Sequence, residues 1–272
     1  MRRQAGIALV SVLWIVALLS VVATSLASSV RTETRLVANT GRMLQAQFAV
    51  ESGVELAALN LMYPQSVQWP VDGSIHSMVI GEADVRIATT NVTGKVDINA
   101  APMPLIRGLL VAAGADADTA DLLADAIMDW RDRDDMRHLN GAEDTDYRIA
   151  GLPWGAKDAP FDSVEELRLV LGMTDALYAS MKDSVTVFSG QSGVNLQHAS
   201  AQVVAAMAGL ENLQVNSSGT VYAVQVEARI DGTIASQVEA TINVTYSGLG
   251  KPFQVLEWHT PLERLFPEEA TL

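Results

Sequence analysis

The sequence predicts an α+β protein in which a long N-terminal helix packs on an antiparallel β-sheet, with a large α-helical domain inserted into that sheet. Three observations favour this fold class. Residues 7–62 carry an unbroken helical pattern, alternating segments lie near 78–93 and after residue 220, and helical patterns fill the space between them. With 272 residues the chain is long enough to bury such a core.

The first helix begins as an apolar segment, since no charged residue occurs between Arg3 and Arg31. About 20 apolar residues cross a bilayer as a helix, and Arg2 and Arg3 before them predict a cytoplasmic N-terminus. Apolar residues then recur at steps of three, four or seven, and no proline occurs before Pro64. We therefore expect one helix of about 80 Å over residues 7–62.

Three interpretations of this segment compete. A cleaved secretion signal needs small residues near its cut, which residues 23–28 supply. A plain membrane anchor needs only the apolar helix. The third interpretation is a prepilin-type segment cut between Gly6 and Ile7. The long one-faced continuation of the helix favours the third, because a secretion signal has no reason to extend into an amphipathic rod.

The middle and the end of the chain supply the other elements. Two short strands are expected near 78–93, and three antiparallel strands are expected after residue 220, with a turn at Asp231-Gly232. An internal repeat aligns the stretch after Val96 with the stretch after Val194, each a short extended entry into a helix. Between the copies, a helix start is expected at FDSVEEL. The pattern of two helices joined by a tight turn resembles helix-hairpin-helix (SAM-like) modules.

Composition limits the function. The 32 acidic and 18 basic residues give a formal net charge of −14, which argues against general nucleic-acid binding. There is no cysteine, so thiol chemistry and disulfides are excluded. The four histidines are scattered without metal-ligand spacing. A membrane-anchored nucleic-acid-binding protein of a DNA-uptake system stays as the alternative function, because of the helix-hairpin-helix texture.

The densest cluster of chemistry lies in the acidic loop, DWRDRDDMRHLNGAEDTDYRIAG, over residues 129–151. So many carboxylates repel one another unless solvent or a cation separates them. Calcium takes six to eight oxygen ligands and tolerates irregular loops. Two alternatives remain open at this point: arginines in the same loop could pair with the acids, or a carboxylate pair could serve a hydrolase.

The N-terminal segment resembles the type IV pilin-like superfamily. In that resemblance Gly6 precedes the cleavage point, and Ile7 becomes the new, usually methylated, N-terminus. Most members carry glutamate at the fifth mature position, where this chain has Ser11. A carboxylate in the hydrocarbon layer costs about 2.5–3.5 kcal/mol, which pairing with a neighbour's free amine offsets. A subunit at the tip has no such neighbour, so the missing glutamate is what a tip subunit should show.

Over nearly its whole length the chain resembles the minor pseudopilin K (GspK) family of bacterial type II secretion systems. The motifs that carry this resemblance are VDINAAP, DWRDRDD with GAEDTDY, FDSVEELRLVLGM and the closing VLEW. The resemblance implies a pilin-like fold and a non-enzymatic role at the tip of a periplasmic pseudopilus, initiating or capping its assembly for protein export. The implied partners are the minor pseudopilins I and J, the major pseudopilin, prepilin peptidase and the inner membrane, with no nucleic acid.

The resemblance also implies calcium in the acidic loop. Carried over to this sequence, the expected ligands are Asp132, Asp134, Glu143 and Asp144, with Asp129 and Asp146 in reserve. The expected organisation is a leader over 1–6, the pilin helix over 7–62, a first β-part over 63–96, the inserted helical domain over 97–190, and a second β-part over 191–272. The protein is expected in the bacterial inner membrane, single-pass, with most of the chain in the periplasm.

Overall fold

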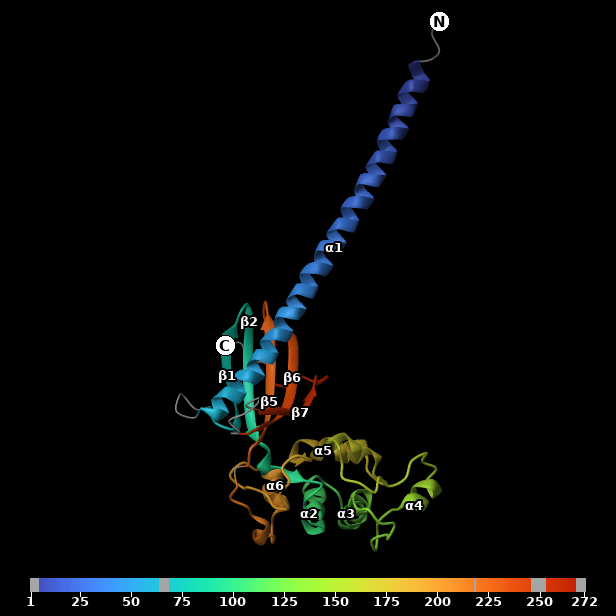
Figure 1. The fold of residues 1–272 in the computed structure, drawn as a ribbon. Coiled ribbons are helices and arrows are strands. Elements are labelled where there is room, and N and C mark those ends of the chain that lie inside the picture. The colour runs from blue at the N-terminus through green and yellow to red at the C-terminus, as the bar shows by residue number, and fades with distance from the viewer. Residues whose placement is uncertain (1–4, 64–68, 218, 246–252, 268–272) are drawn as a thin grey trace.

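The computed structural model describes residues 5–63, 69–217, 219–245 and 253–267 (Figure 1). Residues 1–4 of the expected leader lie outside the described residues, as does Pro64, the expected helix stop. The described chain combines a long N-terminal helix, an antiparallel sheet and a separate group of helices, which is the α+β architecture that the sequence predicts.

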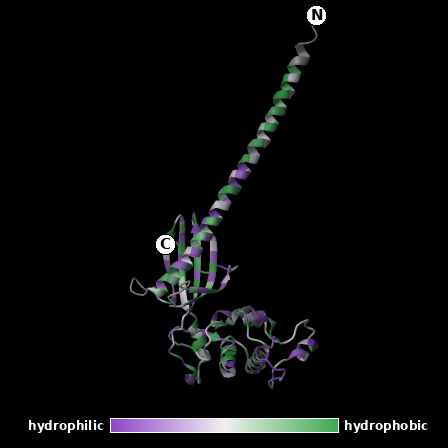
Figure 2. Ribbon diagram, in the orientation of Figure 1, coloured by the Kyte–Doolittle hydropathy of each residue, from purple (hydrophilic) through white to green (hydrophobic). Residues whose placement is uncertain are grey.

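Helix α1 spans Ala5–Met62, a single element of 58 residues, or about 87 Å at 1.5 Å per residue. Figure 1 shows it as a rod of which only the C-terminal part lies on the sheet. The first half is mostly hydrophobic in Figure 2. Polar side chains there need no water, because hydroxyl groups donate to the carbonyl four residues earlier, as Ser20 does to Val16 at 2.8 Å. Thr24, Thr34 and Thr40 do the same.

The five-stranded sheet is antiparallel throughout, in the order β1-β2-β5-β6-β7. Its strands are β1 Asp72–Ile80, β2 Ala83–Asn91, β5 Val221–Ile230, β6 Thr233–Val244 and β7 Phe253–His259. Strand β1 begins earlier than the expected position near residue 78. Residues 72–77 are mostly polar and lack the alternation of a half-buried strand, but hydrogen bonding to β2 at the sheet edge makes them a strand.

Asp231 and Gly232 form the two-residue turn between β5 and β6. Both have positive φ, 53° and 72°, as a type I′ turn requires. Asp and Gly are among the few residues that accept this conformation without a large steric cost. The expected turn position therefore agrees with the structure.

The first hydrophobic core lies between α1 and the sheet. Ala46, Val50 and Val54 of α1 are buried against β-strand residues that include Ile87 and Val226. At Gly53 a Cβ atom would lie 2.7 Å from Val226 Cγ1, so the glycine permits the close approach of helix and sheet. Gly53 thus has a low helix propensity but allows α1 to pack closely on the sheet.

The helical unit is inserted between β2 and β5, which are neighbours in the sheet. Its α-helices are α2 Met103–Ala112, α3 Ala117–Arg131, α4 Asp144–Ile149, α5 Asp175–Met181 and α6 Ala201–Ala206. Short 3-10 helices cover Val92–Gly94 (η1), Val164–Leu169 (η2), Lys182–Ser184 (η3) and Glu211–Leu213 (η4), and β3 Val96–Asp97 pairs in parallel with β4 Val185–Thr186. In Figure 1 this unit lies beyond the end of the sheet that is farther from the N-terminus of α1.

The two copies of the internal repeat pack against each other in the core of this unit. A Cβ atom at Gly108 of α2 would lie 2.4 Å from the Ala206 carbonyl oxygen of α6. Asp97 Oδ1 accepts from Asn99 N, and Asn195 Oδ1 accepts from Gln197 N in the matching position. The helical unit therefore continues past residue 190, where its end was expected. A boundary at residue 190 would divide a single hydrophobic core.

The segment FDSVEEL leads into a 3-10 helix, η2, where the start of a regular α-helix is expected. Leu167 is its only buried residue, and one apolar contact does not repay the cost of nucleating an α-helix. Glu166 accepts from Lys157 Nζ at 2.8 Å and from Asp162 N at 3.2 Å. These bonds tie the segment to the preceding loop instead.

Candidate metal site and partner-facing surface

Two buried carboxylates, Asp125 and Asp129, lie one turn apart on the inner face of α3. Asp125 Oδ2 accepts from the backbone N–H of Asn140 at 3.0 Å and from its side-chain amide at 3.2 Å. Asp129 Oδ1 accepts from the backbone N–H of His138 at 3.0 Å. The two acids thereby fold the acidic loop back against the helix that precedes it.

Asp129, Asp132 and His138 form the centre of the cluster. Each offers one ligand atom, and these atoms lie within 4.8 Å of one another. Asp132 caps the C-terminus of α3, and His138 Nδ1 contacts Asp129 Oδ1. The histidine was missed in the sequence because its distance of nine residues from Asp129 matches no metal motif. Only the loop that returns to α3 brings the two together.

Glu143 stands next to this group, at the N-cap of α4. Partial burial, followed by the charges of Asp129, Asp158 and Asp132, raises the pKa of Glu143 to about 7. Burial, followed by the charge of Asp134, also raises the pKa of Asp132. The hydrogen bond to Asp129 raises the pKa of His138, against the opposing effect of burial. Negative charge therefore accumulates here beyond what the folded chain neutralises.

Several carboxylate oxygens of this cluster are buried without a hydrogen-bond partner and could bind a cation. Asp129 is 0% exposed, and its Oδ2 has no partner within the described part of the chain; the same holds for Asp132 Oδ1, Glu143 Oε1 and Asp158 Oδ1. Leaving such a group unpaired costs about 1–3 kcal/mol or more. Hard oxygen donors in an irregular loop fit calcium. Gly141 is required beside them, because a Cβ there would lie 1.9 Å from Asp129 Oδ2.

The other expected ligands lie around this centre. Asp134 and Asp144 are exposed and lie outside the three-residue group. Asp134 Oδ1 accepts from the backbone N–H of Met136. Asp146, held in reserve, accepts from the backbone N–H of Glu143 and pairs with Arg137 at 3.1 Å. Of the expected ligands and reserves, the structure therefore groups Asp129 with Asp132 and places Glu143 where their charges act on it, while Asp146 bonds within the loop.

Arginine pairing was the open alternative for the acidic loop, but Arg131 and Arg137 make their contacts away from the centre of the cluster. Arg131 donates to the backbone carbonyls of Ala101, at 2.8 Å, and Ile98. Burial lowers the pKa of Arg131. Arg137 pairs with Asp146 at the rim. These contacts leave the inner carboxylate oxygens available to a cation.

The N-terminal half of α1 is the candidate assembly and membrane segment. Of the described residues, α1 is the one helix long and apolar enough to cross a membrane. Gly6 and Ile7 lie in its first turn, and Ser11 is exposed one turn later. Large apolar side chains are exposed from Leu9 to Val37. A helix that exposes such a surface along this length needs lipid or other helices around it.

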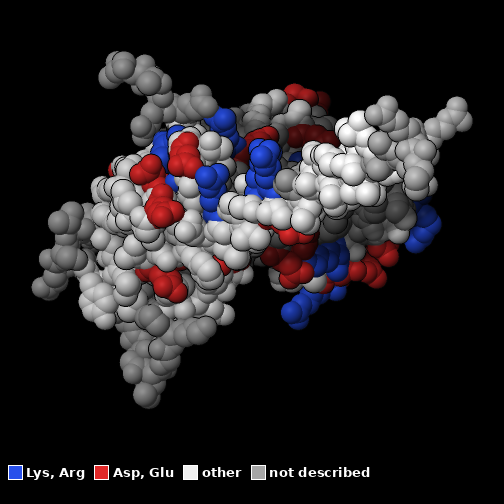
Figure 3. Space-filling view, turned by 90° about the horizontal axis from the view of Figure 1, so that it is seen from above, with Lys and Arg blue, Asp and Glu red and all other residues white. Residues whose placement is uncertain are grey.

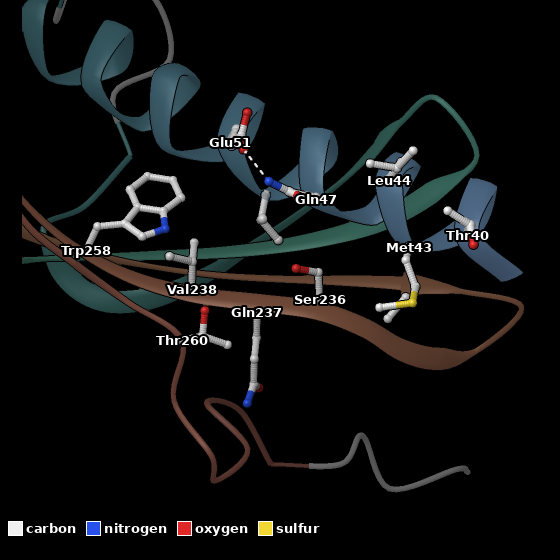
Figure 4. A pocket seen from close by; sticks show the side chains of 12 residues that line it. Thr40, Met43, Leu44, Gln47, Glu51, Ser236, Gln237, Val238, Trp258 and Thr260 are labelled. Atoms are coloured by element: carbon white, nitrogen blue, oxygen red, sulfur yellow. Dashed lines mark hydrogen bonds between the residues drawn. The ribbon is translucent and has the colours of Figure 1, made fainter.

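A groove of about 460 Å³ lies where α1 meets the sheet (Figure 4). Its lining includes Met43, Leu44 and Gln47 of α1, Val238 of β6 and Trp258 of β7. Met43 is 67% exposed. Within residues 43–61 of α1, Ala46, Val50, Val54 and Ala57 pack on the chain's own sheet, so the groove side of the helix stays exposed.

The nucleic-acid alternative gains no support from the charge distribution. Seen from the N-terminal end of α1, acidic and basic side chains are interspersed around a mostly uncharged rod (Figure 3). The first turn of η2 carries two acidic residues, Glu165 and Glu166. They lie in the region whose pattern resembles a helix-hairpin-helix module. Acidic side chains there repel a phosphate backbone.

Comparisons with known proteins agree with this architecture. The family model for type II secretion system protein K matches residues 86–190, and the model of the PilX N-terminal region matches residues 5–55. In the crystal structure of the GspK–GspI–GspJ complex from enterotoxigenic Escherichia coli, a similar chain gives a TM-score of 0.65 at 16% identity, covering 81% of this chain and 97% of that one. That likeness shows the fold.

Similar sequences extend beyond the matched family segments. Type II secretion system protein K of Klebsiella pneumoniae is 30% identical over 65% of this chain and 60% of its own length. The proteins of the same description from Pectobacterium carotovorum and Pseudomonas aeruginosa are 29% and 27% identical, over 60% and 68% of their lengths. The chain thus matches about 60% of the length of the first two relatives. With its pilin-like helix, inserted helical unit and acidic loop, this chain is similar to the type II secretion system protein K family.

Proposed function

We propose that this protein caps the tip of a type II secretion pseudopilus and initiates its assembly, for the export of folded proteins across the outer membrane. The role is mechanical, and we assign it no enzymatic activity. Prepilin peptidase cuts after Gly6, and Ile7 becomes the methylated N-terminus. Helix α1 holds the chain in the inner membrane as a single-pass anchor, with the sheet and the helical unit in the periplasm.

The placement of the helical unit is the observation that carries this proposal. It lies beyond the end of the sheet that is farther from the N-terminus of α1 (Figure 1). If α1 packs among the helices of other subunits, a subunit added on the far side would need the space that this unit occupies. Growth is then possible only from the membrane side, which is the property of a cap.

Ser11 supports the same position. The chain lacks the carboxylate that would pair with the free amine of a subunit already in the filament. A first subunit meets no such amine, and an unpaired carboxylate in the hydrocarbon layer would cost about 2.5–3.5 kcal/mol. Serine removes that cost for a subunit that enters first.

The partners that we propose are the minor pseudopilins I and J and, below them, the major pseudopilin. Their helices would pack along the exposed apolar surface of α1, whose continuation leads to the groove beside Met43 and Trp258 (Figure 4). Packing between helices replaces lipid contacts there. The groove then receives the periplasmic end of a partner helix.

Calcium in the acidic loop is a second part of the proposal. The unpaired oxygens of Asp129, Asp132 and Glu143 would bind the ion, while the exposed Asp134 and Asp144 stay as expected ligands that a small loop movement would have to recruit. Bound calcium would hold the loop between α3 and α4 in one conformation. We expect it to act on stability and on docking to partners rather than on chemistry.

Filament labelling tests the tip position. The full-length chain, tagged at its C-terminus, would be produced with the I, J and major pseudopilins and located on pseudopili by immunogold electron microscopy. We expect gold at one filament end for the wild type. Gold distributed along filaments for both the wild type and Ser11→Glu would refute the tip position. Intact mass of the purified chain tests processing, since a mature start near residue 24 or 28 would instead indicate ordinary secretion.

A further inference from the structure

A nitrogen donor stands inside the cluster of oxygen donors described above. His138 lies with Asp129 and Asp132 in the group whose ligand atoms are within 4.8 Å of one another. Its backbone N–H donates to Asp129 Oδ1 at 3.0 Å, and its ring nitrogen Nδ1 contacts the same oxygen. The loop therefore places the imidazole against the buried carboxylate of Asp129.

An independent observation is that buried carboxylate oxygens at this place have no hydrogen-bond partner in the described chain. Asp129 is fully buried, yet its second oxygen, Oδ2, has no hydrogen-bond partner in the described chain. The Oδ1 atom of the partly buried Asp132 also has none there. A buried carboxylate that lacks partners is strongly destabilising unless a cation compensates it. The side chain of His138 is 39% exposed, so an ion can reach the group from solvent.

The chemistry of the donors decides which cation fits. Calcium and magnesium take oxygen ligands, whereas neutral imidazole suits zinc and its neighbours among the divalent transition metals. Zinc accepts histidine nitrogen at about 2.0–2.1 Å and carboxylate oxygen at about 2.0–2.2 Å, often with three protein ligands and one further position. Two aspartates and one histidine supply the three, and Glu143 or water can take the fourth.

We propose that Asp129, Asp132 and His138 form a site for a divalent transition metal that accepts histidine, with Zn²⁺ as its representative. The inference rests on the metal site of the proposed function, but it does not need calcium to bind there. The imidazole would replace the contact of His138 with Asp129 by a shared bond to the ion. Calcium binding would use the carboxylates alone, so the two ions compete while depending on different residues.

The test uses the full-length chain in detergent, stripped of metal with a chelator and titrated separately with ZnCl₂ and CaCl₂ by calorimetry. We compare the wild type with His138→Gln and with the control Asp118→Asn, an exposed acid in the first turn of α3 and outside the acidic loop. For His138→Gln we expect zinc affinity to fall by at least tenfold and calcium affinity to change by less than about threefold. For the control we expect zinc affinity to stay within threefold of the wild type.

X-ray absorption at the zinc edge gives a readout of the ligand itself. The wild type should show the multiple-scattering signature of one imidazole, and His138→Gln should lose it. Zinc affinity that is unchanged in His138→Gln, or that falls by the same factor as calcium affinity, would overturn the inference. If calcium fails to bind while zinc binds through His138, the calcium part of the proposed function fails and the inference stands.

Discussion

Replacing Glu143 by glutamine should stabilise the metal-free protein at alkaline pH. Glu143 lies among Asp129, Asp132 and Asp158, and burial together with these charges raises its pKa from 4.5 to about 7. Since one pKa unit corresponds to about 1.36 kcal/mol, the difference between a pKa of 4.5 in the unfolded chain and about 7 in the folded protein amounts to about 3 kcal/mol. Glu143 is only partly buried, and solvent screens the repulsion, so we expect about 1 kcal/mol to be measurable.

The sign follows from where the proton is held. The unfolded chain releases the Glu143 proton near pH 4.5, whereas the folded protein keeps it until about pH 7. The contribution of Glu143 to the free energy of unfolding therefore falls between these values and stays low above pH 7. Glu143→Gln removes this loss at pH 8 and has little effect at pH 4.5 or below, where both states are protonated.

Thermal unfolding of the full-length chain in detergent, with chelator present, measures this effect. One kcal/mol corresponds to about 2–4 °C in Tm for a chain of this size. We expect Glu143→Gln to have the higher Tm at pH 8 without metal, and to gain less than the wild type when calcium is added. A lower Tm than the wild type at pH 8, or an undiminished response to calcium, would refute the reasoning.

Two further predictions concern packing and buried charge. Gly53→Ala should destabilise the protein by about 1–3 kcal/mol, because its Cβ would lie 2.7 Å from Val226 Cγ1. Gly41→Ala in the same helix is the matched control, because a Cβ atom at Gly41 would have no atom within 4 Å, and it should be neutral or slightly stabilising. Equal effects of the two substitutions in chemical denaturation would contradict the close contact at Gly53. Glu227→Ala should cost about 3–5 kcal/mol, because Glu227 is 0% exposed and pairs with Arg229 at 2.7 Å and with Arg86 at 3.6 Å. A loss below 1 kcal/mol in the same assay would show that the pair is not held as described.

The sequence already contained most of the fold, because the governing interactions are local and periodic. The apolar run and one-faced pattern predict α1, and Asp231-Gly232 predicts its turn by backbone conformation alone. Val96 and Val194 mark a repeat whose two helices pack together in the structure. Polar strand residues, as in β1, and the 3-10 form of η2 escaped prediction, since neighbouring segments determine both.

By itself, the sequence determined that a membrane-length helix leads an acidic, cysteine-free chain and that a loop rich in carboxylates lies between two helices. Only the tertiary structure decided which acids meet. It turned Asp129 inward, left Asp134 at the surface and returned His138 to the end of α3. The physical reason is that ligand sets depend on side-chain direction and on loop closure, and a buried carboxylate is costly enough to be placed only where the folded chain can compensate it.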